Sequence, residues 1–171
     1  MNGIADWKAD VRAELERLGA GFEERFGYPF GADENFVSEP ETGGSDTTLP
    51  PALAAFYAEV GAVSLPDVHN GYFIHPASRI PMSAEWGLPV RAEVDDIGEV
   101  VTFGTDGSGG FFSLAPADGS VYHLPSGELL NGIYRGGLGA PQRVAKDFPE
   151  FLDRLLAVLR EFTADGQTSG L

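Results

Sequence analysis

The chain has 171 residues, of which 26 are Asp or Glu and 11 are Lys or Arg, so its formal net charge is −15. Proteins that bind phosphate groups need clustered Lys and Arg, so this balance argues against a nucleic-acid partner and against an anionic membrane surface. No apolar run approaches the roughly 18 residues of a membrane span, and the charged first segment lacks the apolar core of a secretory signal. With no cysteine, disulfides and thiolate chemistry are excluded. We predict a single cytoplasmic domain over residues 1–171 that is large enough to bury its own core.

Almost all of the excess negative charge lies in two segments that contain no Lys or Arg. Residues 26–78 hold seven acids, and residues 92–134 hold seven more, which together account for 14 of the 15 excess charges. Such a field does not select a fold, but it steers basic partners toward the protein. The acidity therefore points to binding.

The first predicted element is an amphipathic helix within an N-terminal helical segment, residues 1–26. Apolar residues recur every three or four positions from Ile4 to Phe26, which is the pattern of one buried helix face. Gly19 and Gly21 each cost about 1 kcal/mol in a helix interior, so we expect the helix to end near Leu18. Residues 27–48 are predicted to form an acidic loop.

A core region, residues 49–163, is predicted to contain a second helix and a run of strands. Thr48 could cap the second helix, the two prolines that follow Leu49 suit its first turn, and Gly61 would supply a left-handed stop. The strands are separated by connections too short for crossover helices, so we expect an antiparallel sheet, with a hairpin turn at 116–119. Strands are predicted at 63–65, 72–75, 88–94, 100–104, 110–114, 120–124 and 128–133.

The last predicted element is the clearest helix of the chain. Asp147 and Glu150 have the spacing of a capping box, and apolar residues from Phe148 to Phe162 form one face. Residues 164–171 are predicted to be a flexible tail. The predicted fold is α+β, with a central antiparallel sheet of about five to six strands and N-terminal, middle and C-terminal helices packed on it.

Three groups of residues resemble catalytic or metal sites, but none has the spacing that such chemistry needs. Asp67, His69 and His75 have loose metal-ligand spacing, which a turn explains better. Ser108 lies in Asp-Gly-Ser-Gly-Gly, which lacks the G-x-S-x-G of a nucleophile elbow and reads as a glycine-rich connection. Glu93, Asp95, Asp96 and Glu99 could pair for acid–base work or hold a cation, yet they also fit a turn that meets a basic partner. We therefore predict no catalytic residues, no metal and no cofactor.

Four stretches, taken in order, resemble the SUKH superfamily, the domain shared by the yeast cell-wall-synthesis regulator and many bacterial immunity proteins. They are the Leu-Pro helix and its Gly within residues 49–67, the strand ending in Phe-Gly-Thr-Asp-Gly-Ser-Gly within 100–114, Gly-Ser-Val-Tyr at 119–122, and the Asp-Phe helix start within 144–152. The resemblance covers roughly residues 47–160. The sequence departs from the family pattern at Val60-Gly61-Ala62, where a Gly pair is common, and in the long acidic loop.

The resemblance implies an α+β fold and a non-enzymatic function. Bacterial members look like antidotes that bind and block polymorphic toxins, many of which act on nucleic acids. We therefore expect an immunity protein that neutralises a cognate, basic protein toxin through an acidic surface. A general interaction scaffold of the same fold is the alternative, and a cation-dependent hydrolase is a second one. The chain could be a monomer or a homodimer, because exposed strand edges permit pairing.

The candidate partner-binding residues are aromatic anchors among acids, since buried aromatic side chains dominate interface energies. Trp86 is the first of them, although a core tryptophan would show the same sequence pattern. The predicted partner-binding residues are Tyr72, Glu85, Trp86, Asp95, Asp96, Glu99, Asp106 and Tyr134, with Phe111 as a further aromatic candidate.

Overall fold

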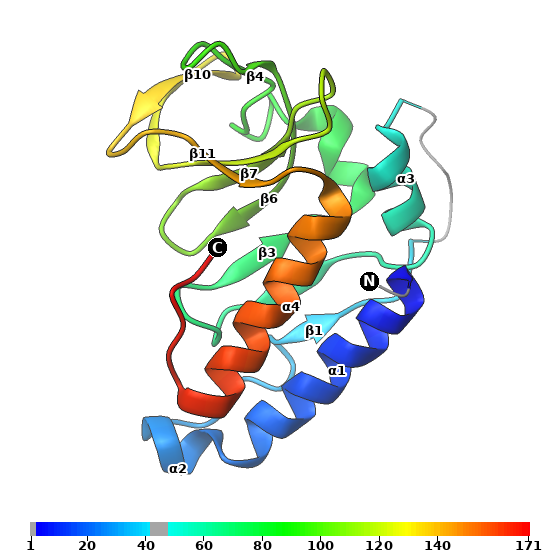
Figure 1. The fold of residues 1–171 in the computed structure, drawn as a ribbon, viewed down its shortest axis with the longest axis vertical. Coiled ribbons are helices and arrows are strands. Elements are labelled where there is room, and N and C mark those ends of the chain that lie inside the picture. The colour runs from blue at the N-terminus through cyan, green and yellow to red at the C-terminus, as the bar shows by residue number, and fades with distance from the viewer. Residues whose placement is uncertain (1–2, 42–47) are drawn as a thin grey trace.

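A computed structural model describes residues 3–41 and 48–171 of the chain (Figure 1). Four α-helices and one 3-10 helix accompany two β-sheets in this part of the chain. The helices are α1 (Ile4–Ala20), α2 (Phe22–Phe26), α3 (Pro51–Tyr57), η1 (Ala77–Met82) and α4 (Phe148–Asp165).

The larger sheet has seven strands in the order β1-β2-β3-β6-β7-β8-β11, and every neighbouring pair is antiparallel. Its strands are β1 (Phe36–Val37), β2 (Val63–Leu65), β3 (Tyr72–Ile74), β6 (Val101–Asp106), β7 (Phe111–Leu114), β8 (Val121–Leu124) and β11 (Gln142–Ala145). The predicted α+β class is confirmed, and the sheet is one strand larger than expected.

The smaller sheet has four strands in the order β5-β4-β10-β9, and the sequence did not predict it as a separate sheet. Its strands are β4 (Arg91–Ala92), β5 (Gly98–Glu99), β9 (Gly127–Leu130) and β10 (Ile133–Gly137). β4 and β10 pair in parallel, so the expectation of purely antiparallel pairing is wrong here. Parallel pairing needs a long connection, and residues 93–132 provide one by way of the larger sheet.

The main core lies between the larger sheet and its helices. α1 and α4 run side by side across the sheet (Figure 1), and the Trp7 Nε1–H donates to the carbonyl of Leu152 at 2.8 Å. Phe103 and Phe148 meet edge to face between the sheet and α4. The expected packing of the helices on the sheet is therefore confirmed.

The predicted N-cap of α4 at Asp147 is confirmed, whereas the return bond to Glu150 differs from a standard capping box. The Asp147 carboxylate accepts a hydrogen bond from the Glu150 N–H at 2.8 Å. Glu150 accepts in return from the backbone N–H of Lys146, one residue earlier than a standard capping box requires. The helix begins where the sequence predicted.

The ends of the other two predicted helices differ from expectation. α1 continues past Leu18 to Ala20 because the ring of Phe30 packs where Gly19 has no side chain. α3 begins at Pro51, with Pro50 at its N-cap position, and ends at Tyr57. Gly61 does not adopt a left-handed conformation and so does not end the helix as predicted.

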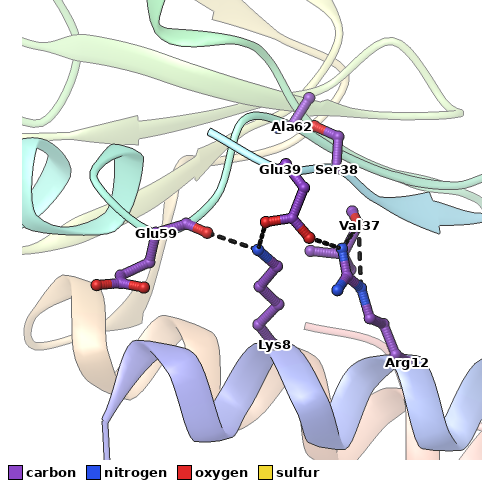
Figure 2. Close-up of polar contacts among 7 residues, drawn as sticks. All are labelled: Lys8, Arg12, Val37, Ser38, Glu39, Glu59 and Ala62. Atoms are coloured by element: carbon purple, nitrogen blue, oxygen red, sulfur yellow. Dashed lines mark hydrogen bonds and ion pairs between the residues drawn. The ribbon is translucent and has the colours of Figure 1, made fainter. Parts of the chain in front are cut away.

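The predicted acidic loop is partly ordered by the sheet and by α1. It contains β1, and the Glu39 carboxylate binds the Lys8 ammonium at 2.6 Å and the Arg12 guanidinium at 2.8 Å, as Figure 2 shows. These hydrogen bonds, from Lys8 first, lower the pKa of Glu39. Residues 42–47, in the same predicted loop, lie outside the described residues.

The predicted tail does not extend away from the protein. Gly166 ends α4 in a left-handed conformation, and the chain then turns back so that Leu171 packs against the main core. Gly170 lies next to His69 and Tyr72, and the backbone N–H of Leu171 donates toward the hydroxyl oxygen of Tyr72. The predicted flexible tail therefore lies against the protein, and its flexibility stays a prediction.

Two predicted strand regions differ in the structure, and one strand was not predicted. Only Arg91–Ala92 of the region 88–94 forms a strand. The region 128–133 is divided into the hairpin β9–β10 by Asn131 and Gly132, whose positive φ angles of 51° and 78° suit a tight hairpin turn. β11 was not predicted, because Gln-Arg-Val-Ala carries no strand signal of its own.

Candidate functional site

Large apolar side chains are exposed on neighbouring segments beside the smaller sheet. Trp86 is 55% exposed, Met82 43%, Val90 39% and Leu130 48%. Isolated exposed apolar residues are ordinary, whereas a group of them marks an interaction surface. We call Met82, Trp86, Val90 and Leu130 the Trp86 patch.

Backbone hydrogen bonds order the segment 82–90 and join it to the β9–β10 turn. The Trp86 N–H donates to the Met82 carbonyl at 3.1 Å, and the Val90 N–H donates to the Gly132 carbonyl at 2.8 Å, next to the β9–β10 turn. A side chain at Gly132 would press on Val90 and Ala84, so glycine allows this close approach. The patch is therefore held on a defined framework.

The indole of Trp86 rests on a cation. The guanidinium carbon of Arg79 lies 4.8 Å from the centre of the Trp86 ring, which is a cation–π arrangement. The Nε of Arg79 and the Nε2 of His75 are buried, and neither has a hydrogen-bond partner among the described residues. The sequence left open whether Trp86 lies in the core, and the structure places it on the surface.

Five of the predicted binding residues come together around the smaller sheet. Glu85 is exposed beside Trp86, and Asp95, Asp96 and Glu99 are exposed around the β4–β5 turn. Asp95 and Asp96 have positive φ angles of 51° and 57°, a conformation that Asp tolerates better than most residues. The predicted turn is therefore confirmed, and it presents carboxylates to solvent.

The structure also brings two bases into this acidic region, which the sequence windows did not show. Arg91 and Arg135 lie just outside the base-free segment 92–134. Arg91 is the register partner of Glu99 across β4 and β5, and the Arg135 Nε lies 3.7 Å from a Glu93 carboxylate oxygen. The acidic surface is thus partly neutralised, and Asp95 and Asp96 form its unpaired tip among the described residues.

Two predicted aromatic anchors are buried, so their prediction as surface anchors is corrected. Tyr134 is fully buried in the core of the smaller sheet, and its hydroxyl donates to the Pro125 carbonyl at 2.8 Å. Tyr72 is 5% exposed in β3, within the main core. Phe111 is half-buried against the core of the smaller sheet. Their alternating strand positions point inward, which the sequence alone did not reveal.

Asp106 also lies apart from the Trp86 patch. It is the register partner of Tyr72 in the larger sheet, and one carboxylate oxygen lies 2.7 Å from His123 Nε2. The other oxygen accepts the backbone N–H groups of Ser108 and Gly110, each at 2.8 Å. Asp106 therefore closes the β6–β7 turn, and Ser108 lies in the glycine-rich connection that the sequence predicted.

The candidate metal ligands are placed in different surroundings. Asp67 accepts hydrogen bonds from Gly31 and Asn35, His69 is exposed, and His75 is half-buried beside Arg79. Within residues 3–41 and 48–171, no three His, Asp or Glu side chains are grouped so that they could hold a metal ion. In the same ranges, no helix combines the length and apolar character needed to cross a membrane.

His75 should make the stability of the protein depend on pH. Burial, and then the nearby Arg79 charge, lowers the pKa of His75 to about 4. Below its ordinary pKa of about 6.5 the unfolded chain binds a proton that the folded chain does not, so stability falls as the pH drops from about 6.5 to about 4. We expect the replacement His75→Gln to make this fall shallower, by at most about 1.4 kcal/mol per pH unit.

Urea unfolding at pH 7.0 and pH 4.5 measures this effect. His69→Gln is the matched control, because it makes the same replacement at an exposed histidine. An identical loss of stability on acidification in wild type and His75→Gln would contradict the prediction.

Comparisons with protein-family models, with curated proteins and with solved structures found no match. The resemblance to the SUKH superfamily therefore stays a prediction from the sequence.

Proposed function

We propose that this chain is a cytoplasmic, non-enzymatic immunity protein of the SUKH type that binds and neutralises a cognate protein toxin. The observation that carries the proposal is the half-exposed indole of Trp86, which is supported on Arg79, is next to the exposed Glu85 and lies beside the sheet whose β4–β5 turn carries three further exposed carboxylates. A large aromatic side chain inside a polar rim is the usual composition of an interface hot spot. The SUKH resemblance then supports a toxin as the partner.

The surrounding charge supports a basic partner. Glu85, Asp95, Asp96 and Glu99 are exposed, and Arg79, Arg91 and Arg135 are the bases that the structure places near them. A nuclease presents a basic surface to its phosphate substrate, and complementary charge accelerates association with such a surface. A protein bound there would also block access of the substrate.

The direct experiment pairs the protein with the toxin domain encoded by neighbouring coding sequence. Both proteins are purified, their stoichiometry is measured by calorimetry, and toxin activity is measured as the protein is added. The proposal expects equimolar binding and complete loss of activity. Binding that leaves the toxin fully active would favour the interaction scaffold instead, and no binding would contradict both.

Reversing the charge of the β4–β5 turn should slow association with the toxin. We expect Asp95→Lys, Asp96→Lys and Glu99→Lys together to reduce the association rate with the toxin about tenfold or more at low salt, because the steering field is weakened. The rate should also depend less on salt. Stopped-flow fluorescence at two or more salt concentrations measures both effects.

A charge-matched control distinguishes the effect of the local acidic surface on the association rate from the effect of net charge. Glu16→Lys, Glu23→Lys and Glu24→Lys change the same amount of charge at exposed positions on α1 and α2, which lie opposite β4 and β10 in Figure 1. The control should retain most of the association rate. Equal slowing by both triple variants would contradict the assignment of the docking surface.

A further inference from the structure

A groove lies beside α1 and α2, and Figure 1 shows α2 at the opposite end of the molecule from β4 and β10. The groove has a volume of about 670 Å³ between one side of α1 and the segment 29–37. Such a volume lies within the range of binding sites. Leu15, Phe30 and Val37 give it an apolar lining, and Phe36, which is 39% exposed, stands in the groove without a partner that would cover it among the described residues.

The loop side of the groove is held rigidly. Asp67 accepts hydrogen bonds from the Gly31 N–H at 2.9 Å and from the Asn35 side chain at 2.7 Å. The buried Asn35 side chain also donates to the Gly31 carbonyl and accepts from the Asp67 N–H. A site that is already ordered loses less entropy when a ligand binds.

The groove includes the free edge of the larger sheet. β1 is the edge strand, and the Ser38 N–H and carbonyl both bond toward β2, to Ala62 and Gly61. The N–H and C=O of adjacent residues in an antiparallel strand point to opposite sides, so those of Val37 face the free edge. Arg12 donates to the Val37 carbonyl at 2.6 Å (Figure 2), and no acceptor for the Val37 N–H is found among the described residues.

The charge of the groove is negative. Glu16 and Glu23 line it, both are exposed, and neither has an ion-pair partner among the described residues. Arg12, the base in the groove lining, is occupied by Glu39 and by the Val37 carbonyl. An incoming segment therefore meets two free carboxylates beside an apolar surface.

We propose that this groove binds a short, extended, basic segment of another protein. An apolar side chain of that segment packs on Phe36 and Phe30, and its Lys or Arg side chains pair with Glu16 and Glu23. The apolar contact supplies affinity, and the complementary charge selects a basic segment. The site is separate from the Trp86 patch, so it does not depend on the proposed immunity function.

The test uses a synthetic peptide of sequence Lys-Ile-Lys-Phe-Lys, blocked at both ends, titrated into the ¹⁵N-labelled full chain. We expect saturable NMR shifts of the Val37 amide and of neighbouring amides in 15–37. The double variant Glu16→Lys with Glu23→Lys should raise the dissociation constant about tenfold or more. Phe36→Ser should also raise it, without a change of charge.

Matched controls separate this site from nonspecific attraction to an acidic protein. Glu59→Lys with Glu128→Lys makes the same charge change at exposed positions outside the groove lining and should leave the affinity within about twofold. The peptides Glu-Ile-Glu-Phe-Glu and Lys-Ser-Lys-Ser-Lys should give no saturable shifts in the groove. Equal weakening by both double variants, binding of either control peptide, or shifts confined to residues near Trp86 would overturn the proposal.

Discussion

Replacing Trp86 by alanine is expected to weaken toxin binding about 30-fold or more while lowering the free energy of unfolding by less than about 1 kcal/mol. Truncating an aromatic residue at the centre of an interface costs about 2 kcal/mol or more of binding energy. In the free protein the indole is 55% exposed and rests on Arg79 in a cation–π contact, so little folding energy is lost. Calorimetric titration and urea unfolding measure the two quantities.

Leu138→Ala is the control for this variant. Leu138 is 97% exposed, so its removal changes the exposed apolar area without touching the Trp86 patch. Trp86→Phe should lose less affinity than Trp86→Ala, because it keeps an aromatic ring over Arg79. Wild-type affinity of Trp86→Ala would place the interface elsewhere, whereas a large loss of stability would show that Trp86 serves the fold.

Replacing Gly61 by alanine is expected to destabilise the protein by about 2–4 kcal/mol. The added methyl group would overlap the carbonyl oxygen of Glu39 and approach the Ser38 Oγ to 2.6 Å, and the backbone on both sides is fixed by hydrogen bonds. Forcing a group into a packed site costs about 1–3 kcal/mol and more when backbone must move. Chemical denaturation, followed by circular dichroism, measures the loss.

Gly21→Ala is the matched glycine control. Gly21 has a φ of −132°, and no atom lies within 4 Å of the position that its Cβ would take. Its replacement should therefore change stability by less than about 0.5 kcal/mol. If Gly61→Ala were as harmless as Gly21→Ala, the close approach of residues 38–39 to Gly61 would not constrain the fold.

Part of the candidate surface could be predicted from the sequence. Trp86 beside Glu85, and the acids of the turn 95–99, are neighbours along the chain, so their grouping survived in the structure. Tyr72 and Tyr134 looked equivalent to Trp86 because they too lie among acids. Each occupies an inward strand position, however, and the face of a strand that is buried depends on the packing of the sheet.

The difference between local and long-range contacts also explains which parts of the fold could be predicted. Helical periodicity and capping located α1 and α4, since these signals arise within a few residues of one another. The second sheet was missed because the pairing of β4 with β10 joins residues about forty positions apart. Gly61 was assigned to the wrong role for a similar reason, because the atom it must avoid belongs to Glu39.

The sequence by itself determined the α+β class, most helices and strands, the excess of acid and its two base-free segments. Those properties depend on composition and on local spacing. Only the tertiary structure decided which aromatic residues reach the surface and that α1 and β1 enclose a groove. It also decided that Arg91 and Arg135 partly neutralise the negative charge near the β4–β5 turn. Each of those outcomes depends on contacts between segments that are distant in the sequence. The net charge of −15 is consequently distributed unevenly, with unpaired carboxylates at the β4–β5 turn.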